Sequence, residues 1–359
     1  MIRLDSCKIE APIDSLLNYN ASCFITNKPT NHEGIVIGNT ATLSKQGKGE
    51  IGLNGCCIDY QNDKITLQLS SKILYDDYAK GININTIEQA IGNLSKTGII
   101  SLDTEAIINS ASLYLTDETH HTFIDDLLND WPNIVNGLSC ACVNTRYTPT
   151  PYSTAGNKGI VYSTDHKSKK CRLIMYSKYI DLRMKKNGSF LRMCKNPMKV
   201  LNESKNTLRI EGNHTSFKTI RERFMLKPGI PKLYDVLTAK GQPCLYYLNE
   251  ITQPKKNPQL ELILKSEYRG RMFLENEGIN TIIRAAEYDE AVIESIIRSK
   301  FSYASYKAYW YGRDKSKRSG IRNQIIALRA QDKQHEPGML NPILQSIIKQ
   351  LQDDYAAAV

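Results

Sequence analysis

The sequence predicts an α+β protein in which an antiparallel-sheet domain, residues 1–225, precedes a mainly α-helical domain, residues 226–359. A chain of 359 residues exceeds one ordinary domain and suits two. Through the first part, short β-type runs are separated by Gly, Asn and Pro, as in strands joined by turns. Beyond about residue 217 the apolar residues recur at helical spacing. Interleaved strands and helices with antiparallel neighbours favour an α+β layer over a parallel doubly wound sheet.

Apolar residues at helical spacing predict a helix over residues 85–97, ended by Gly98. Two strand-like runs, residues 159–163 and 171–178, flank a polar segment and predict a hairpin. Further strands are expected at residues 34–37, 64–69, 111–116, 139–145 and 207–213. Further helices are expected at residues 123–129, 217–225, 231–239, 280–284, 287–299, 322–330 and 340–351.

The composition favours a cytoplasmic protein that binds nucleic acid. The chain is 41% hydrophobic and 23% charged, and no apolar run approaches the roughly 20 residues of a membrane span. Residues 1–12 do not resemble a signal peptide. A net charge of +10 attracts polyanions, although a basic surface that serves only solubility remains open. The nine cysteines lack a CxxC pair and are expected to be reduced thiols.

The segment 171–178, Cys-Arg-Leu-Ile-Met-Tyr-Ser-Lys, holds the best candidate for a nucleophile. Side chains alternate along a strand, so Tyr176 and Lys178 are expected on one face. A phenolate can attack phosphorus while an ammonium offsets charge on the phosphate oxygens. Most tyrosines on strands are packing residues, so this segment by itself is compatible with a packing role or a catalytic role for Tyr176.

Two other segments carry candidate metal ligands. On the strand 207–213, Arg209, Glu211 and Asn213 share a face, and carboxylate and amide oxygens suit Mg²⁺ or Mn²⁺. Asp117 and Glu118 lie where the strand at 111–116 is expected to give way to a helix, beside His120 and His121. A solvated edge strand and a polar helix cap explain these segments equally well.

Together these segments resemble the filamentous-phage gene II family of rolling-circle replication initiators and, more distantly, plasmid rolling-circle Rep proteins. Residues 159–178, GIVYSTDHKSKKCRLIMYSK, look like the family's hairpin ending in Tyr-x-Lys, and residues 179–182 continue the likeness. Residues 207–211 resemble a later strand with an arginine and a glutamate, and residues 69–75 resemble a segment that precedes the catalytic strands. The resemblance covers roughly residues 1–225.

The resemblance implies a nicking-enzyme-like domain that cuts one DNA strand through a 5′-phosphotyrosine. Tyr176 would be the nucleophile, assisted by Lys178, and Glu211, Asp117 and Glu118 would hold Mg²⁺ or Mn²⁺. Arg172 and Arg209 would contact DNA. It also implies single-stranded and duplex origin DNA, a host helicase and a polymerase as partners, in the cytoplasm of a bacterial host cell, with no membrane partner.

Two departures from the family keep alternatives open. The strand at 112–116 lacks the family's aspartate, and the His-hydrophobe-His motif of larger nicking enzymes is absent from the sequence. A noncatalytic origin-binding protein of the same fold, or a relaxase of plasmid transfer, therefore remains an alternative.

A basic, aromatic cluster in residues 305–329 predicts a second DNA-binding surface. Its cations can neutralise phosphates while Tyr306, Tyr309, Trp310 and Tyr311 stack on bases. A charged face over a core of aromatic residues is the alternative. The candidate cations are Lys307, Arg313, Lys315, Lys317, Arg318 and Arg322.

Overall fold

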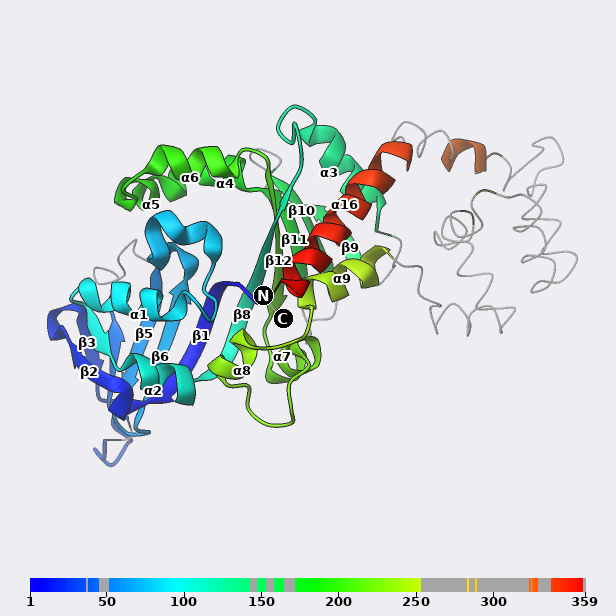
Figure 1. The fold of residues 1–359 in the computed structure, drawn as a ribbon. Helices are drawn as coiled ribbons and strands as arrows, with labels where there is room; N and C mark the ends of the chain where they lie inside the picture. The colour runs from blue at the N-terminus through cyan, green and yellow to red at the C-terminus, as the bar shows by residue number, and fades with distance from the viewer. Residues whose placement is uncertain are drawn as a thin grey trace, which may run out of the picture. The chain divides into compact units, whose positions relative to one another are not determined.

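A ten-stranded antiparallel sheet is the centre of the computed structural model (Figure 1). The strand order is β3-β4-β5-β6-β1-β8-β12-β11-β10-β9. The structure describes residues 1–36, 38–44, 52–142, 147–152, 158–164, 172–252 and 337–357, and also residues 283, 288, 323 and 325–328. The strands are β1 (Leu4–Pro12), β3 (Phe24–Asn27), β4 (Thr40–Leu43), β5 (Leu53–Asp59), β6 (Lys64–Ser70), β8 (Ser112–Phe123), β9 (Tyr147–Pro151), β10 (Gly159–Thr164), β11 (Arg172–Ser177) and β12 (Thr207–His214). The predicted α+β class with a large antiparallel sheet is confirmed.

The predicted hairpin at 159–178 is confirmed as β10 paired with β11, and β12 lies on the other side of β11. The register places Tyr176 opposite Arg209 and Ile174 opposite Glu211. On β12, Arg209 lies in turn opposite His121 of β8. Because directly opposed residues share a face, Tyr176, Arg209, Glu211 and His121 lie on one side of the sheet.

Strand β8 is longer than the sequence suggested. The expected helix at 123–129 is wrong, because Phe123 ends the 12-residue strand Ser112–Phe123 and residues 125–129 form turns. Polar residues 117–122 stay extended since β8 pairs with β1 on one side and β12 on the other. The expected strand at 139–145 is also wrong at its start, which belongs to helix α3 (Trp131–Cys140). In the expected strand at 34–37, the described residues 34–36 contribute an isolated bridge at Val36.

Several predicted helices are present. Helix α1 (Ile87–Lys96) buries Ile87, Ala90, Ile91 and Leu94, as expected from their spacing. Helices α7 (Phe217–Phe224), α8 (Leu233–Leu237) and α16 (Pro337–Ala356) match expected segments. The segments 280–284 and 287–299 lie almost entirely outside the described residues, whereas in the expected helix at 322–330 the described residues, 323 and 325–328, are helical. The sequence analysis did not predict α2 (Thr104–Ser110), α9 (Pro243–Thr252) or the two-stranded sheet of β2 (Leu16–Tyr19) and β7 (Ile100–Leu102).

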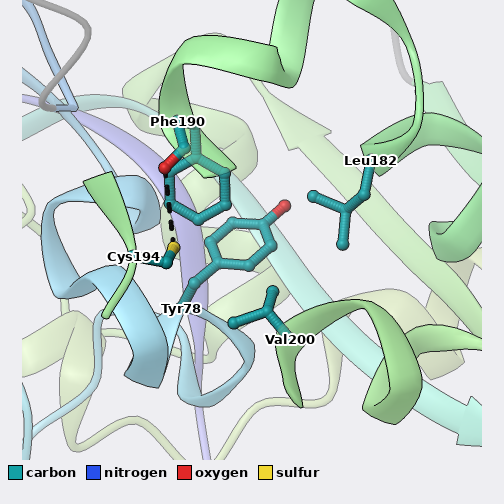
Figure 2. Close-up of a cluster of buried hydrophobic side chains, with 5 residues drawn as sticks. All are labelled: Tyr78, Leu182, Phe190, Cys194 and Val200. Carbon is teal, nitrogen blue, oxygen red and sulfur yellow. Dashed lines mark hydrogen bonds between the residues drawn. The ribbon is translucent and has the colours of Figure 1, made fainter. Parts of the chain in front are cut away.

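Three short helices follow β11 directly: α4 (Lys178–Leu182), α5 (Gly188–Met193) and α6 (Pro197–Ser204). They share an apolar cluster with the 3₁₀ segment η3 (Ser71–Lys80). Figure 2 shows the side chains of this cluster converging on the ring of Tyr78: Leu182, Phe190, Cys194 and Val200. The cluster therefore holds the helices that follow Lys178 against η3 and positions Tyr78.

The chain divides into two compact units, of which the first comprises residues 1–132, 146–248 and 345–359. The second comprises residues 133–145 and 249–344. The first unit therefore includes α8, the start of α9 and the end of α16, which were assigned from the sequence to the helical domain 226–359. The described part of the chain has no helix long and apolar enough to cross a membrane.

Candidate active site around Tyr176

Tyr176 lies near the end of β11 with its side chain only 3% exposed. Its ring packs with Val161, Ile174 and Tyr152, whose ring centroid is 5.2 Å away. On the neighbouring strand Gly159 lies opposite it, and a Cβ there would fall 2.7 Å from Cβ of Tyr176. Only glycine fits this close approach, so β10 holds the tyrosine tightly in place.

The hydroxyl of Tyr176 donates a hydrogen bond of 2.6 Å to Oε1 of Glu211. The same carboxyl pairs with Nε of Arg209 at 2.6 Å. Burial raises the pKa of Glu211 to about 7, although Arg209 opposes this shift. Burial also raises the pKa of Tyr176 well above its usual value, and the charge of Glu211 adds to this. Glu211 is thus placed and tuned to accept a proton from Tyr176 near neutral pH.

Lys178 is the first residue of α4, not the last residue of the strand, yet its ammonium reaches the site. Its Nζ donates to the Tyr176 hydroxyl at 3.2 Å and to Oδ2 of Asp181 at 3.2 Å. Burial lowers the pKa of Lys178 to about 8. Asp181 also pairs with Lys158 at 2.9 Å and Lys186 at 3.3 Å, so three lysines share one carboxylate beside the tyrosine.

Arg209 lies beneath the site and is fully buried. Its guanidinium pairs with Asp5 of β1 and with Glu211, and its Nη1 donates to the Tyr78 hydroxyl at 2.8 Å. The expectation that Arg209 contacts DNA is therefore corrected, because its positive charge is paired with two carboxylates inside the protein. Arg172, on the same face of β11, is half-buried.

The expected metal ligands are divided between the two faces of the sheet. Asp117 lies on the Tyr176 face, where it accepts hydrogen bonds from Ser6 and from Asn213. Glu118 is the next residue of the same strand and points to the opposite face, toward His120 and Cys244. A carboxylate on that face cannot share a metal ion with Glu211, so Glu118 leaves the expected set.

The sequence analysis missed Asp5, Tyr78, Lys158 and Asp181 as parts of this site. Asp5 and Tyr78 come from segments about 100 or more residues away from Tyr176, and no local pattern marks either of them. Burial raises the pKa of the Asp5 carboxyl, but Arg209, Lys178 and the hydrogen bond from Ser71 together lower it to about 2. Asp181 follows Lys178 by three residues at the start of a helix, a spacing that could have suggested the ion pair.

A cavity of about 20 Å³ lies beside the site, lined in part by His121, Lys178 and Tyr78. It has room for about one water molecule and none for a nucleotide. A nucleic-acid strand would therefore have to approach Tyr176 from another side. The six candidate cations of the basic cluster in residues 305–329 lie outside the described residues: Lys307, Arg313, Lys315, Lys317, Arg318 and Arg322.

Comparison of this chain with models of known protein families, with curated proteins and with solved structures found no match.

Proposed function

We propose that this chain is a rolling-circle replication initiator that nicks one DNA strand with Tyr176 and retains the 5′ end as a phosphotyrosine. The observation that carries the proposal is the Tyr176 hydroxyl, held between a carboxylate tuned to about neutral pH and an ammonium. The likeness to the gene II family at residues 159–182 and 207–211 adds to it. The excess of positive charge fits origin DNA as substrate.

In the proposed reaction, the Tyr176 oxygen forms a bond to phosphorus while the bond from phosphorus to the 3′ oxygen breaks. The phenolic proton passes to Glu211 and then to the departing 3′ oxygen, which becomes a free hydroxyl and primes synthesis. Lys178 offsets negative charge as it develops on the phosphate. One phosphodiester replaces another, so the 3′ hydroxyl can attack the phosphotyrosine in the reverse step and rejoin a strand.

Mg²⁺ or Mn²⁺ is the expected cofactor, because it polarises the phosphate that is attacked. Among the residues on the Tyr176 face, Glu211, Asp117 and Asn213 carry the oxygen ligands that hard ions prefer. In the described geometry Oε1 of Glu211 already contacts Tyr176 and Arg209. Fewer oxygens of Glu211, Asp117 and Asn213 are therefore open to a metal ion. A host helicase and polymerase in a bacterial cytoplasm remain the partners implied by this function.

A noncatalytic origin-binding protein is the second candidate function. Two observations favour it, the burial of Tyr176 and the position of Glu118 away from the other acidic residues. Under this alternative the buried charges around Tyr176 only stabilise the sheet.

One experiment separates the two functions. The full chain is incubated with Mn²⁺ and with single-stranded DNA that carries the origin region and is labelled at its 3′ end, then denatured and separated by electrophoresis. Nicking by Tyr176 transfers label to the protein band, and Tyr176→Phe abolishes the transfer. Tyr179→Phe is the matched control and should keep it. If the wild-type protein acquires no label but still shifts duplex DNA in a gel, the result would support the noncatalytic origin-binding protein instead.

A further inference from the structure

A second cluster of ligand-type side chains lies on the face of β8 and β12 opposite Tyr176. Oxygen of Glu118, nitrogen of His120 and sulfur of Cys244 all lie within 4.8 Å of one another, and all three residues are buried. Glu118 and His120 are two residues apart on β8, and Cys244 comes from α9. A thiol, an imidazole and a carboxylate are the donors typical of zinc sites.

A neutral His120 ring carries one N–H, yet both of its ring nitrogens face carboxylate oxygens. Nδ1 lies 2.7 Å from Oδ2 of Asp354, and Nε2 lies 2.9 Å from Oε1 of Glu118. If Nδ1–H donates to Asp354, the lone pair of Nε2 faces a carboxylate, and a cation between them removes the conflict. A carboxylate that fixes the other nitrogen of a metal-binding histidine is a common second layer around zinc.

His214 supplies an independent observation. It is fully buried on β12, and neither ring nitrogen has a hydrogen-bond partner in the described part of the chain. A Cβ at Gly212 would lie 3.2 Å from Nε2 of His214 and 3.3 Å from Sγ of Cys244, so the two atoms converge over that glycine. A buried polar group without a partner is costly and rare, whereas a metal would satisfy it.

We propose that Cys244, His120 and Glu118, with His214 as fourth ligand, bind a structural divalent metal ion of the zinc class. The site is closed, since all four residues are buried and none lies on the Tyr176 face. Tyr355 donates to Oε1 of Glu118 at 2.6 Å, so the ion would join β8, β12, α9 and the C-terminal helix α16. This role goes beyond the proposed nicking activity and does not depend on it.

The test is the metal content and the cobalt spectrum of the full-length protein. Purified protein should contain about one zinc ion per chain, and chelator-treated protein should bind Co²⁺ with a thiolate-to-cobalt absorption band. Cys244→Ser should lose the band and bind metal at least tenfold more weakly, which is about 1.4 kcal/mol or more. Cys194→Ser, which replaces another buried cysteine, should keep both.

The rival explanation is a buried imidazolium of His120 that donates to both Glu118 and Asp354. Protein that purifies without zinc and shows neither a cobalt band nor a rise in Tm on added zinc would overturn the metal site. Should Cys244→Ser fail to fold, the cobalt spectrum of the wild type and of His214→Gln decides the question. Tyr176→Phe should bind the metal as the wild type does, which separates this result from the nicking assay.

Discussion

The hydroxyl of Tyr176 donates a 2.6 Å hydrogen bond to Oε1 of Glu211, although the two residues are 35 positions apart in the sequence. The register of β11 and β12 places Glu211 diagonally across from Tyr176 on one face of the sheet. Arg209 pairs with the same carboxyl from behind. The proposed nucleophile, its proposed proton acceptor and a compensating charge thus lie within one small region of the sheet.

Glu211→Gln should reduce nicking much more than DNA binding. Glutamine keeps the size of the side chain but cannot take the Tyr176 proton, and loss of a general base typically costs about 10²- to 10⁴-fold in rate. Single-turnover nicking and a filter-binding titration measure the two effects. Partial recovery in excess Mn²⁺ would show that the carboxylate also holds the metal, and an unchanged nicking rate would remove Glu211 from the site.

The rate of nicking should have a bell-shaped pH profile. Glu211, with a pKa of about 7, must lose its proton, so the rate rises as pH passes about 7. Lys178, with a pKa of about 8, must keep its proton, so the rate falls above about 8. The two apparent values belong to the coupled group. Glu211→Gln should flatten the acidic limb of the profile, and Lys178→Arg should move the alkaline limb to higher pH. If both variants keep the wild-type profile, these roles would be contradicted.

The stability of the fold should also respond to Glu211. Burial keeps its carboxyl protonated up to about pH 7, whereas the unfolded chain loses this proton near its ordinary value of 4.5. Between these values the native state binds more protons, so the free energy of unfolding falls as pH rises. The fall is about 3 kcal/mol at 1.36 kcal/mol for each pKa unit. Urea unfolding of wild type against Glu211→Gln isolates this effect, since the variant should lack it.

Arg209→Leu should destabilise the fold by about 3–5 kcal/mol, because it leaves Asp5 and Glu211 buried without their cation. Arg172→Leu, on the neighbouring strand and half-buried, is the control and should cost less than about 1 kcal/mol. Chemical denaturation measures both. A small effect at Arg209, with a weaker salt dependence of DNA binding, would restore the sequence-based expectation that this residue contacts DNA.

Neutralising Lys315, Lys317 and Arg318 together should weaken DNA binding and flatten its salt dependence. Each lost phosphate contact lowers the slope of log affinity against log salt by roughly 0.7 to 0.9, so three contacts change it by about two. Nicking at saturating protein should persist, because Tyr176, Lys178 and Glu211 are unchanged. A triple variant with the parental slope would place the DNA path on the sheet domain instead.

The strands around Tyr176 could be predicted from the sequence, because alternation and turn residues are local signals. The same is true of the helix at 85–97. The pairing of Tyr176 with Lys178 was also accessible, since the two residues are neighbours along the chain. Lys178 was expected to reach the site from the end of the strand, but it does so as the first residue of helix α4.

Only the tertiary structure decided which carboxylates accompany the tyrosine. Residues 117–122 were polar enough to suggest a turn, and the pairing of β8 with two strands is what keeps them extended. Once they are extended, Asp117 and Glu118 must face opposite sides, which sends Glu118 to His120 and Cys244. Asp5 and Tyr78 join Arg209 from distant segments. Such contacts depend on strand register and long-range packing, which a local pattern of residues does not encode.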